Sequence, residues 1–300
     1  MSTGDITAGA GLRYLKRLNL YQHENTYEIL FDTLSRNIDH RDTNKEFEMK
    51  YLTIRDIRGN TESFTLDKNG FEVHNFGSSL DGKPVGTVRP QDVMDHYLAD
   101  VAQFLFDHVD RADRVCIFDY YLLSGNVHCS SDDTASGIMS WVRPDQEVHV
   151  DHSPSAAISR VLTHMTEDAN NLLKGRFRLV SVWKPLHHPG EDLPMAVCSG
   201  SSVATNDLTE CHYPRNQGRF SGAVLNAHFN EAHEWYYLNH QTPNEALIMK
   251  VFDSSQTVES KFCLRTTFLD PGYQKGRPER MGIEVRALVF SGPADEEPIT

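Results

Sequence analysis

The second half of the chain alternates short hydrophobic runs with turn-forming residues. The runs cover residues 177–183, 195–198, 234–238, 246–252, 261–268 and 282–290. Gly, Pro, Asn and Asp separate them, most densely over residues 239–244. Short strands that follow one another through turns, mostly without crossover helices, are typical of an antiparallel barrel or sandwich.

The first half has a mixed pattern. Alternating polar and apolar positions predict strands over residues 46–57, 63–73 and 115–122, and helical spacing predicts helices over residues 27–34 and 91–108. Ser153-Pro154 begins a further predicted helix that extends to about Leu173, since proline suits the first helical turn. The pattern therefore predicts a mainly β fold with helices, a double-stranded β-helix (jelly roll). We expect one domain over residues 1–300, with an N-terminal elaboration at about 1–140 and a core at about 141–292.

Composition narrows the range of partners. The chain of 300 residues has a formal net charge of −13, which argues against nucleic acid or an anionic membrane surface as the main partner. Its five cysteines are scattered and never form a CxxC pair, as expected of reduced thiols. The first 18 residues lack an apolar signal region, and no stretch is long enough to cross a bilayer. We expect a soluble, cytoplasmic protein, and the pattern leaves a homo- or hetero-oligomer open.

The polar run at residues 147–154 carries the main chemical signal. His149 and Asp151 share one face of an extended segment, because successive side chains on a strand point to opposite sides. An imidazole and a carboxylate placed in this way can bind one metal ion side by side, as in two-His-one-carboxylate Fe(II) oxygenases. The alternative is a solvated polar strand end, because this triplet is common by chance.

The last predicted strand carries charged residues on one face. Arg280, Gly282, Glu284 and Arg286 alternate with the apolar residues Ile283, Val285, Ala287 and Val289. An inward-facing arginine needs a charged partner. That partner is either the carboxylate of a co-substrate or an internal acid such as Glu284. Trp183 is a candidate for lining an apolar substrate pocket, or it belongs to the core.

Several motifs occur in a fixed order along residues 46–290. They are Asp-Ile-Arg-Gly at 56–59, Phe-Thr-Leu-Asp-Lys-Asn-Gly-Phe at 64–71, Val-His-Val-Asp at 148–151, Val-Trp-Lys-Pro-Leu at 182–186, Trp-Tyr-Tyr at 235–237, Lys-Val-Phe-Asp-Ser at 250–254 and Ile-Glu-Val-Arg-Ala-Leu-Val-Phe at 283–290. Together they resemble the fungal AsaB-type hydroxylase/desaturase family, which includes gibberellin-desaturase-like and cephem-methoxylase-related proteins.

The resemblance implies a jelly roll, non-haem Fe(II) and 2-oxoglutarate. It also implies hydroxylation or desaturation of a small hydrophobic natural product in fungal secondary metabolism. His149 and Asp151 would then bind the iron, and Arg280 would pair with the 2-oxoglutarate carboxylate, which a guanidinium fork matches.

The chain departs from the family pattern at two positions. Where the family reads Pro-His-Thr-Ala-Phe, with histidine as the third iron ligand, residues 264–268 read Leu-Arg-Thr-Thr-Phe, so that Arg265 takes the ligand position. A guanidinium has no lone pair to give to a metal. The Arg-x-Ser of the last strand is Arg280-Met281-Gly282 here, without the hydroxyl.

These departures leave several interpretations open. Another histidine could supply the third ligand; His233 is one candidate, and His152, His228 and His240 are others. Alternatively, only His149, Asp151 and waters hold the iron. In a third interpretation, the cavity catalyses a non-redox isomerisation or cyclisation, in which Arg265 stabilises negative charge and His149 or Asp151 transfers protons. In a fourth interpretation, the chain is a non-catalytic subunit that supports a partner enzyme.

Overall fold

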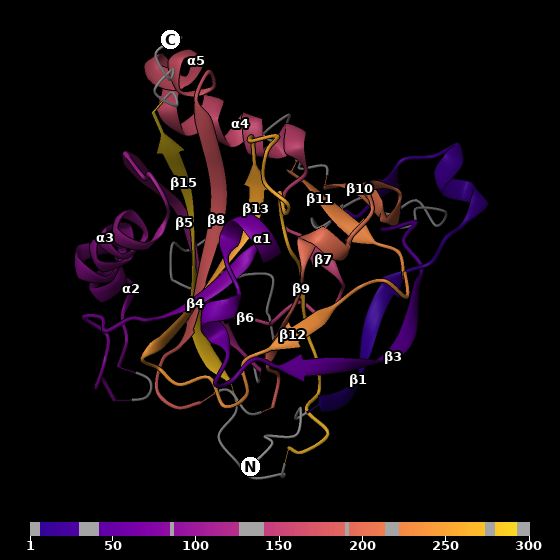
Figure 1. Ribbon diagram of the computed structural model, residues 1–300, viewed down its shortest axis with the longest axis horizontal. Helices are drawn as coiled ribbons and strands as arrows, with labels where there is room; N and C mark the ends of the chain where they lie inside the picture. The colour runs from indigo at the N-terminus through magenta and orange to yellow at the C-terminus, as the bar shows by residue number, and fades with distance from the viewer. Residues whose placement is uncertain are drawn as a thin grey trace, which may run out of the picture.

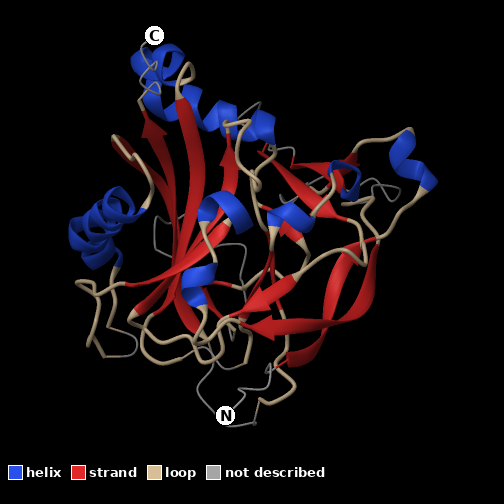
Figure 2. Ribbon diagram, in the orientation of Figure 1, coloured by secondary structure: helices blue, strands red, loops and turns tan. Residues whose placement is uncertain are grey.

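The computed structural model describes residues 7–29, 42–84, 87–125, 141–189, 192–213, 222–273 and 280–292. Strands dominate this part of the chain and form two sheets (Figure 2). The mainly β prediction agrees with this architecture. No helix in the described ranges is long and apolar enough to span a membrane.

The smaller sheet has six strands in the order β4-β13-β8-β15-β5-β6. Their bounds are β4 (Phe71–Asn75), β13 (Glu245–Asp253), β8 (Arg176–Pro185), β15 (Met281–Ser291), β5 (Arg114–Ser124) and β6 (Trp141–Val142). The long strand β15 runs antiparallel to β8 on one side and to β5 on the other. The last predicted strand therefore lies inside this sheet.

The larger sheet has nine strands in the order β1-β3-β12-β9-β14-β7-β11-β10-β2. Their bounds are β1 (Thr7–Leu15), β3 (Phe47–Asp56), β12 (Trp235–Tyr237), β9 (Met195–Cys198), β14 (Leu264–Thr267), β7 (His149–Val150), β11 (Gly222–Ala227), β10 (Leu208–Tyr213) and β2 (Thr26–Tyr27). Short strands from distant parts of the sequence thus meet at its centre.

The helices in the described ranges are short. They are α1 (Leu66–Asn69), α2 (Pro90–Asp92), a π-helical turn (Val93–Tyr97), α3 (Leu98–His108), α4 (Pro154–Met165) and α5 (Ala169–Leu172). Short 3₁₀ turns cover Asn19–Gln22, Thr61–Ser63, Thr166–Asp168, Gly200–Ser202 and Thr205–Asp207. Ser153 caps α4 by accepting a hydrogen bond from the Ala156 amide, as the Ser-Pro signal predicts.

Helix α3 packs beside β5 and β15 on the outer face of the six-stranded sheet (Figure 1). The apolar residues of β15 form one hydrophobic cluster with residues of α3 and the π turn. The cluster includes Ile283, Val285, Ala287 and Val289 of β15 with Val93, Tyr97, Val101 and Leu105. Because side chains alternate along a strand, Glu284 and Arg286 face the other way. The predicted division of this strand into two faces is confirmed.

The structure corrects two predicted elements and describes only the first residues of a third. Residues 63–73 are not one strand, because Thr65 caps the short helix α1 and Gly70 ends it in the left-handed conformation at φ 85° before β4 begins. The helix from Pro154 stops at Met165, because Thr166 takes a positive φ of 41°. Most of the helix predicted over residues 27–34 lies outside the described residues, and Tyr27 itself is in β2.

Candidate active site in the cavity between the sheets

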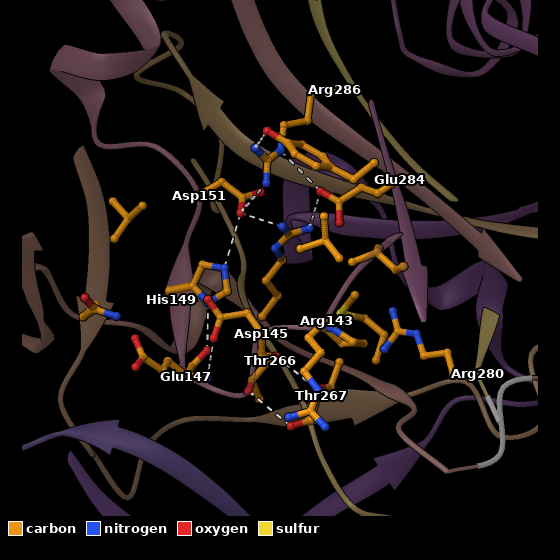
Figure 3. Close-up of a pocket in the computed structure, with 18 of the residues that line it drawn as sticks. Arg143, Asp145, Glu147, His149, Asp151, Thr266, Thr267, Arg280, Glu284 and Arg286 are labelled. Atoms are coloured by element: carbon orange, nitrogen blue, oxygen red, sulfur yellow. Dashed lines mark hydrogen bonds and ion pairs between the residues drawn. The ribbon is translucent and has the colours of Figure 1, made fainter. Parts of the chain in front are cut away.

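A cavity of about 450 Å³ takes its wall from both sheets. Strands β7, β11 and β14 of the larger sheet contribute His149, Asn226 and Arg265, and β15 of the smaller sheet contributes Glu284 and Arg286. Figure 3 shows charged side chains from these strands converging on the cavity. Side chains that are distant in sequence are therefore brought together by strand pairing.

Three cavity residues form a row across the larger sheet. Arg265 of β14 is the register partner of His149 of β7, and His149 is in turn the partner of Asn226 of β11. Register partners on antiparallel strands present their side chains on the same face. A guanidinium, an imidazole and an amide therefore lie next to one another on the cavity wall.

Arg265 is held by two carboxylates. Its Nη2 lies 2.5 Å from Asp151 Oδ1, and its Nη1 lies 2.8 Å from Glu284 Oε1. Arg286 contacts the same two oxygens, at 3.1 Å and 3.3 Å. Ser181 of β8 donates a further hydrogen bond to Glu284 over 2.7 Å. Two guanidinium groups and two carboxylates thus form one buried cluster whose formal charges cancel.

The arginines keep both carboxylates ionised. Burial alone raises the pKa of Asp151, but the neighbouring Arg265 and Arg286 hold it well below its usual range. The same two arginines lower the pKa of Glu284 against the effect of burial. Asp151 is therefore a fixed anion, and its Oδ2 atom has no hydrogen-bond partner among the described residues.

His149 lies beside this cluster. Its Nε2 is 3.3 Å from Asp151 Oδ1, and its Nδ1 is 2.7 Å from the carbonyl oxygen of Glu147. Burial lowers the pKa of His149, but Asp145 and Asp151 outweigh it, and the net pKa is raised. The two ring nitrogens are thereby fixed in orientation, with Nε2 toward the cluster.

Arg280 occupies another part of the cavity wall, away from His149 (Figure 3). It is fully buried, donates to the carbonyl oxygen of Leu193 over 2.7 Å, and stacks on the ring of Trp183 at 4.3 Å. Its Nε and Nη2 have no partner within the described structure. Burial lowers the pKa of Arg280 to about 9, and Glu284 and Asp192 offset only part of that effect. Trp183 does not line the cavity itself but positions Arg280.

Gly282 explains the second departure from the family pattern. A Cβ atom at this position would lie 2.9 Å from the Lys184 carbonyl oxygen and 3.1 Å from the indole of Trp183. A serine would therefore require the Lys184 backbone to shift and the Trp183 indole, which supports Arg280, to move by a few tenths of an ångström. Glycine at position 282, which lacks the hydroxyl, leaves the space that the Trp183 indole occupies beside Arg280.

The side chains around His149 and Asp151 do not fit a three-ligand iron site. The described residues contain no group of three or more His, Cys, Asp or Glu side chains that could hold a metal ion. The third position is taken by the Arg265 guanidinium, which is a cation without a lone pair and already bonds to Asp151 Oδ1. An added divalent cation would have to displace that arginine from a buried, charge-balanced cluster.

The histidines considered as substitutes are engaged elsewhere. His233 Nδ1 lies 3.0 Å from Tyr14 Oη and its Nε2 lies 3.3 Å from Asp207 Oδ2. His228 bonds to Thr209 and to the carbonyl oxygen of Leu15, and His152 accepts a hydrogen bond from Arg160. Within the described structure, none of these histidines, nor His240, is among the residues that line the cavity.

Comparison with known proteins identifies the lineage of this site. A family model described as "Oxidoreductase/YMDC permease-like domain" matches residues 12–290. The Fe(II)/2-oxoglutarate-dependent dioxygenase nvfI of Aspergillus novofumigatus is 35% identical over 80% of this chain and 83% of its own. The hydroxylase/desaturase poxK of Penicillium oxalicum is 28% identical over 83% of this chain and 82% of its own.

The structural comparison agrees. The solved structure of the iron and alpha-ketoglutarate-dependent endoperoxidase NvfI superimposes with a TM-score of 0.80 at 28% identity, over 95% of this chain and 98% of that one. The chain belongs to the family of fungal Fe(II)/2-oxoglutarate-dependent oxygenases.

Membership in this oxygenase family confirms the predicted resemblance, the jelly-roll fold class and the enzyme class. The family implies Fe(II) and 2-oxoglutarate as cofactors and secondary metabolism as the setting. In this chain the position that the resemblance assigns to the third ligand holds Arg265, which bonds to Asp151.

Sequence reasoning missed Asn226. It is on β11 (Gly222–Ala227), which is not among the strands predicted from the sequence. The short apolar run Ala223-Val224-Leu225 was the available signal for a strand. The pairing of that strand with β7, which places Asn226 beside His149, depends on the tertiary structure.

Proposed function

We propose that this chain is a tailoring enzyme of secondary metabolism that rearranges a small, largely hydrophobic natural product without net oxidation. The reaction is an isomerisation or cyclisation in the cavity between the sheets. The observation that carries the proposal is the Arg265 guanidinium, which stands opposite His149 and bonds to Asp151 at 2.5 Å. A fixed internal cation here stabilises negative charge on a substrate oxygen.

The side chains divide the work as follows. Asp151 and Glu284 hold Arg265 in place, so that the cation needs no reorganisation during the reaction. His149 takes a proton from one substrate atom and returns one to another, so the mass is unchanged. Arg280 lines the cavity, and two of its buried nitrogens are unpartnered among the described residues. It binds a substrate oxygen in place of the 2-oxoglutarate carboxylate expected from the resemblance.

Oxidation with Fe(II) and 2-oxoglutarate is the reaction that the sequence resemblance predicts first and that the relatives carry; the unpaired nitrogens of Arg280 suit a carboxylate and favour it. In that case His149 and Asp151 are the iron ligands. We place either reaction in the cytosol, where the thiols of the four described cysteines stay unpaired. The same assay of the purified chain shows whether the reaction requires another subunit.

Turnover with and without oxygen separates the two candidates. The substrate for this assay is the intermediate that accumulates in a strain from which this protein has been deleted. The purified chain is incubated with it in air and anaerobically, and under each atmosphere with and without 2-oxoglutarate. We expect a product of unchanged mass under all four conditions by liquid chromatography and mass spectrometry. Dependence on both oxygen and 2-oxoglutarate, with formation of succinate, would return the chain to the oxygenase mechanism.

Arg265→Met provides the residue-level test. Loss of the cavity cation is expected to lower kcat by roughly 100-fold or more, the magnitude typical of removing one transition-state donor. Arg58→Met is the control, because Arg58 pairs with Glu245 at the surface. Activity that is unaffected by Arg265→Met would contradict the assigned role.

A further inference from the structure

Asn226 differs from Asn44, another buried amide described in this structure. The Asn226 side chain is fully buried, and neither its Nδ2 nor its Oδ1 has a hydrogen-bond partner among the described residues. By contrast, Asn44 Oδ1 accepts from the Tyr27 amide at 2.9 Å and its Nδ2 donates to the Asn25 carbonyl at 3.0 Å. A buried amide without partners costs free energy, so each such group in a native protein needs an explanation.

The position of Asn226 supplies that explanation. Asn226 lines the cavity and is the register partner of His149, on the side opposite Arg265. The hydrogen bonds of the charged cluster reach His149 and Asp151, and none of those described includes the amide. Asp151 Oδ2 is likewise unpartnered among the described residues of the same wall. Two polar groups near the imidazole are thus left for a molecule in the cavity.

We infer that Asn226 is the residue that recognises the substrate, and that the substrate presents a carbonyl group next to a hydrogen-bond donor. The amide offers a donor and an acceptor side by side, so its complement is a lactam, a carboxamide or a hydroxy ketone. The amide is neutral, and the neighbouring cluster already balances its own charges, so the recognised group is neutral as well. This inference rests on the proposed function, because it takes the cavity as the substrate site.

Stability measurements separate a recognition role from a structural one. Asn226→Leu removes a buried amide that bonds to no described residue, so the melting temperature is expected to stay the same or rise. Asn44→Leu, the matched control, removes two hydrogen bonds to the backbone and is expected to lower the melting temperature by roughly 4 °C. A fall for Asn226→Leu as large as the fall for Asn44→Leu would overturn the inference, since the amide would then be part of the fold.

Binding of simple probes tests the chemical class. Saturation-transfer NMR is recorded with δ-valerolactam, which offers an N–H beside a carbonyl, and with δ-valerolactone, which offers the carbonyl alone. We expect a stronger signal from the lactam with the wild-type chain, and loss of that preference in Asn226→Leu and in the smaller replacement Asn226→Ser. Equal signals from both probes, or a preference that survives both substitutions, would overturn it.

These readouts are independent of turnover. If the chain proves to need oxygen and 2-oxoglutarate, the proposed reaction fails while the lactam preference and the stability result still decide the role of Asn226. If the lactam preference is absent while an unchanged-mass product forms, the recognition residue is wrong and the reaction stands.

Discussion

Two charged clusters in this molecule, each centred on buried ion pairs, use the same kinds of side chain to different effect. In the first, Lys250 of β13 lies 2.6 Å from Asp253 and 2.9 Å from Asp67, and also donates to the Ser260 carbonyl oxygen. Arg176 joins the same two carboxylates. Neither Lys250 nor Asp253 has an unpartnered side-chain atom among the described residues. This cluster ties β13, β8 and the start of α1 together.

The cluster at the cavity is also charge-balanced, but it is incomplete in its hydrogen bonds. Within the described structure, Asp151 Oδ2 is left without a partner, and so are two nitrogens of Arg280 and both amide atoms of Asn226 on the same cavity wall. Buried polar atoms are ordinarily paired, so unpaired ones that gather around a cavity indicate a place for a ligand. The first cluster therefore stabilises the fold, whereas the cluster at the cavity has unpaired polar atoms beside it that can bind a ligand.

The largest expected effect is a gain of metal binding when a histidine replaces Arg265 in the cavity cluster. Arg265→His removes the competing cation and supplies the imidazole that a two-His-one-carboxylate site requires. We expect this variant to retain one Co(II) or Fe(II) ion per chain after anaerobic gel filtration, measured by mass spectrometry of the metal. The wild-type chain and Arg265→Met are expected to retain none. Metal bound by the wild type and lost in Asp151→Asn would contradict this prediction.

Removing Lys250, one of the two cations of the other cluster, is expected to affect stability alone. In Lys250→Met, the buried Asp253 keeps only Arg176 as a charged partner among the described residues. Leaving a buried charge uncompensated typically costs about 3–5 kcal/mol, so with the Arg176 contact retained the free energy of unfolding is expected to fall by about 3 kcal/mol, the lower end of that range. Urea unfolding measures the cost. Native-state turnover should match the wild type, and a loss of turnover beyond the unfolded fraction would show that the two clusters are not separable.

The pH dependence of stability gives the smallest and sharpest test. Burial raises the pKa of Asp253, but Arg176 and Lys250 lower it below its ordinary value. The stability that this carboxylate contributes is therefore present above the unfolded pKa, near 3.9, and is lost as pH falls through the lower folded value. We expect Asp253→Asn to cost about 2 kcal/mol at pH 7 and progressively less below pH 4. A cost that does not change with pH would assign the effect to packing.

Much of the architecture follows from local pattern. The hydrophobic run at residues 246–252 predicts β13, the alternation in residues 282–290 predicts β15 with its two faces, and Ser153-Pro154 predicts the start of α4. The prediction of one strand over residues 63–73 was wrong, because a capping threonine and a left-handed glycine outweighed the alternation. The strands β1 and β10 were missed, since polar and glycine-rich strands carry little hydrophobic signal, and β11 was missed although it contains the short apolar run 223–225.

The sequence by itself determined the lineage and the central substitution. Ordered motifs along residues 46–290 indicate the oxygenase family, and Arg265 stands where the resemblance implies a histidine. Only the tertiary structure decided what that arginine does. Its partners Asp151 and Glu284 come from segments 114 and 19 residues away (265 − 151 and 284 − 265), and their meeting depends on how the two sheets pack. The role of Asn226 also depended on the tertiary structure. Whether a buried amide has hydrogen-bond partners is decided by the neighbouring residues in the fold, which the sequence at position 226 does not specify.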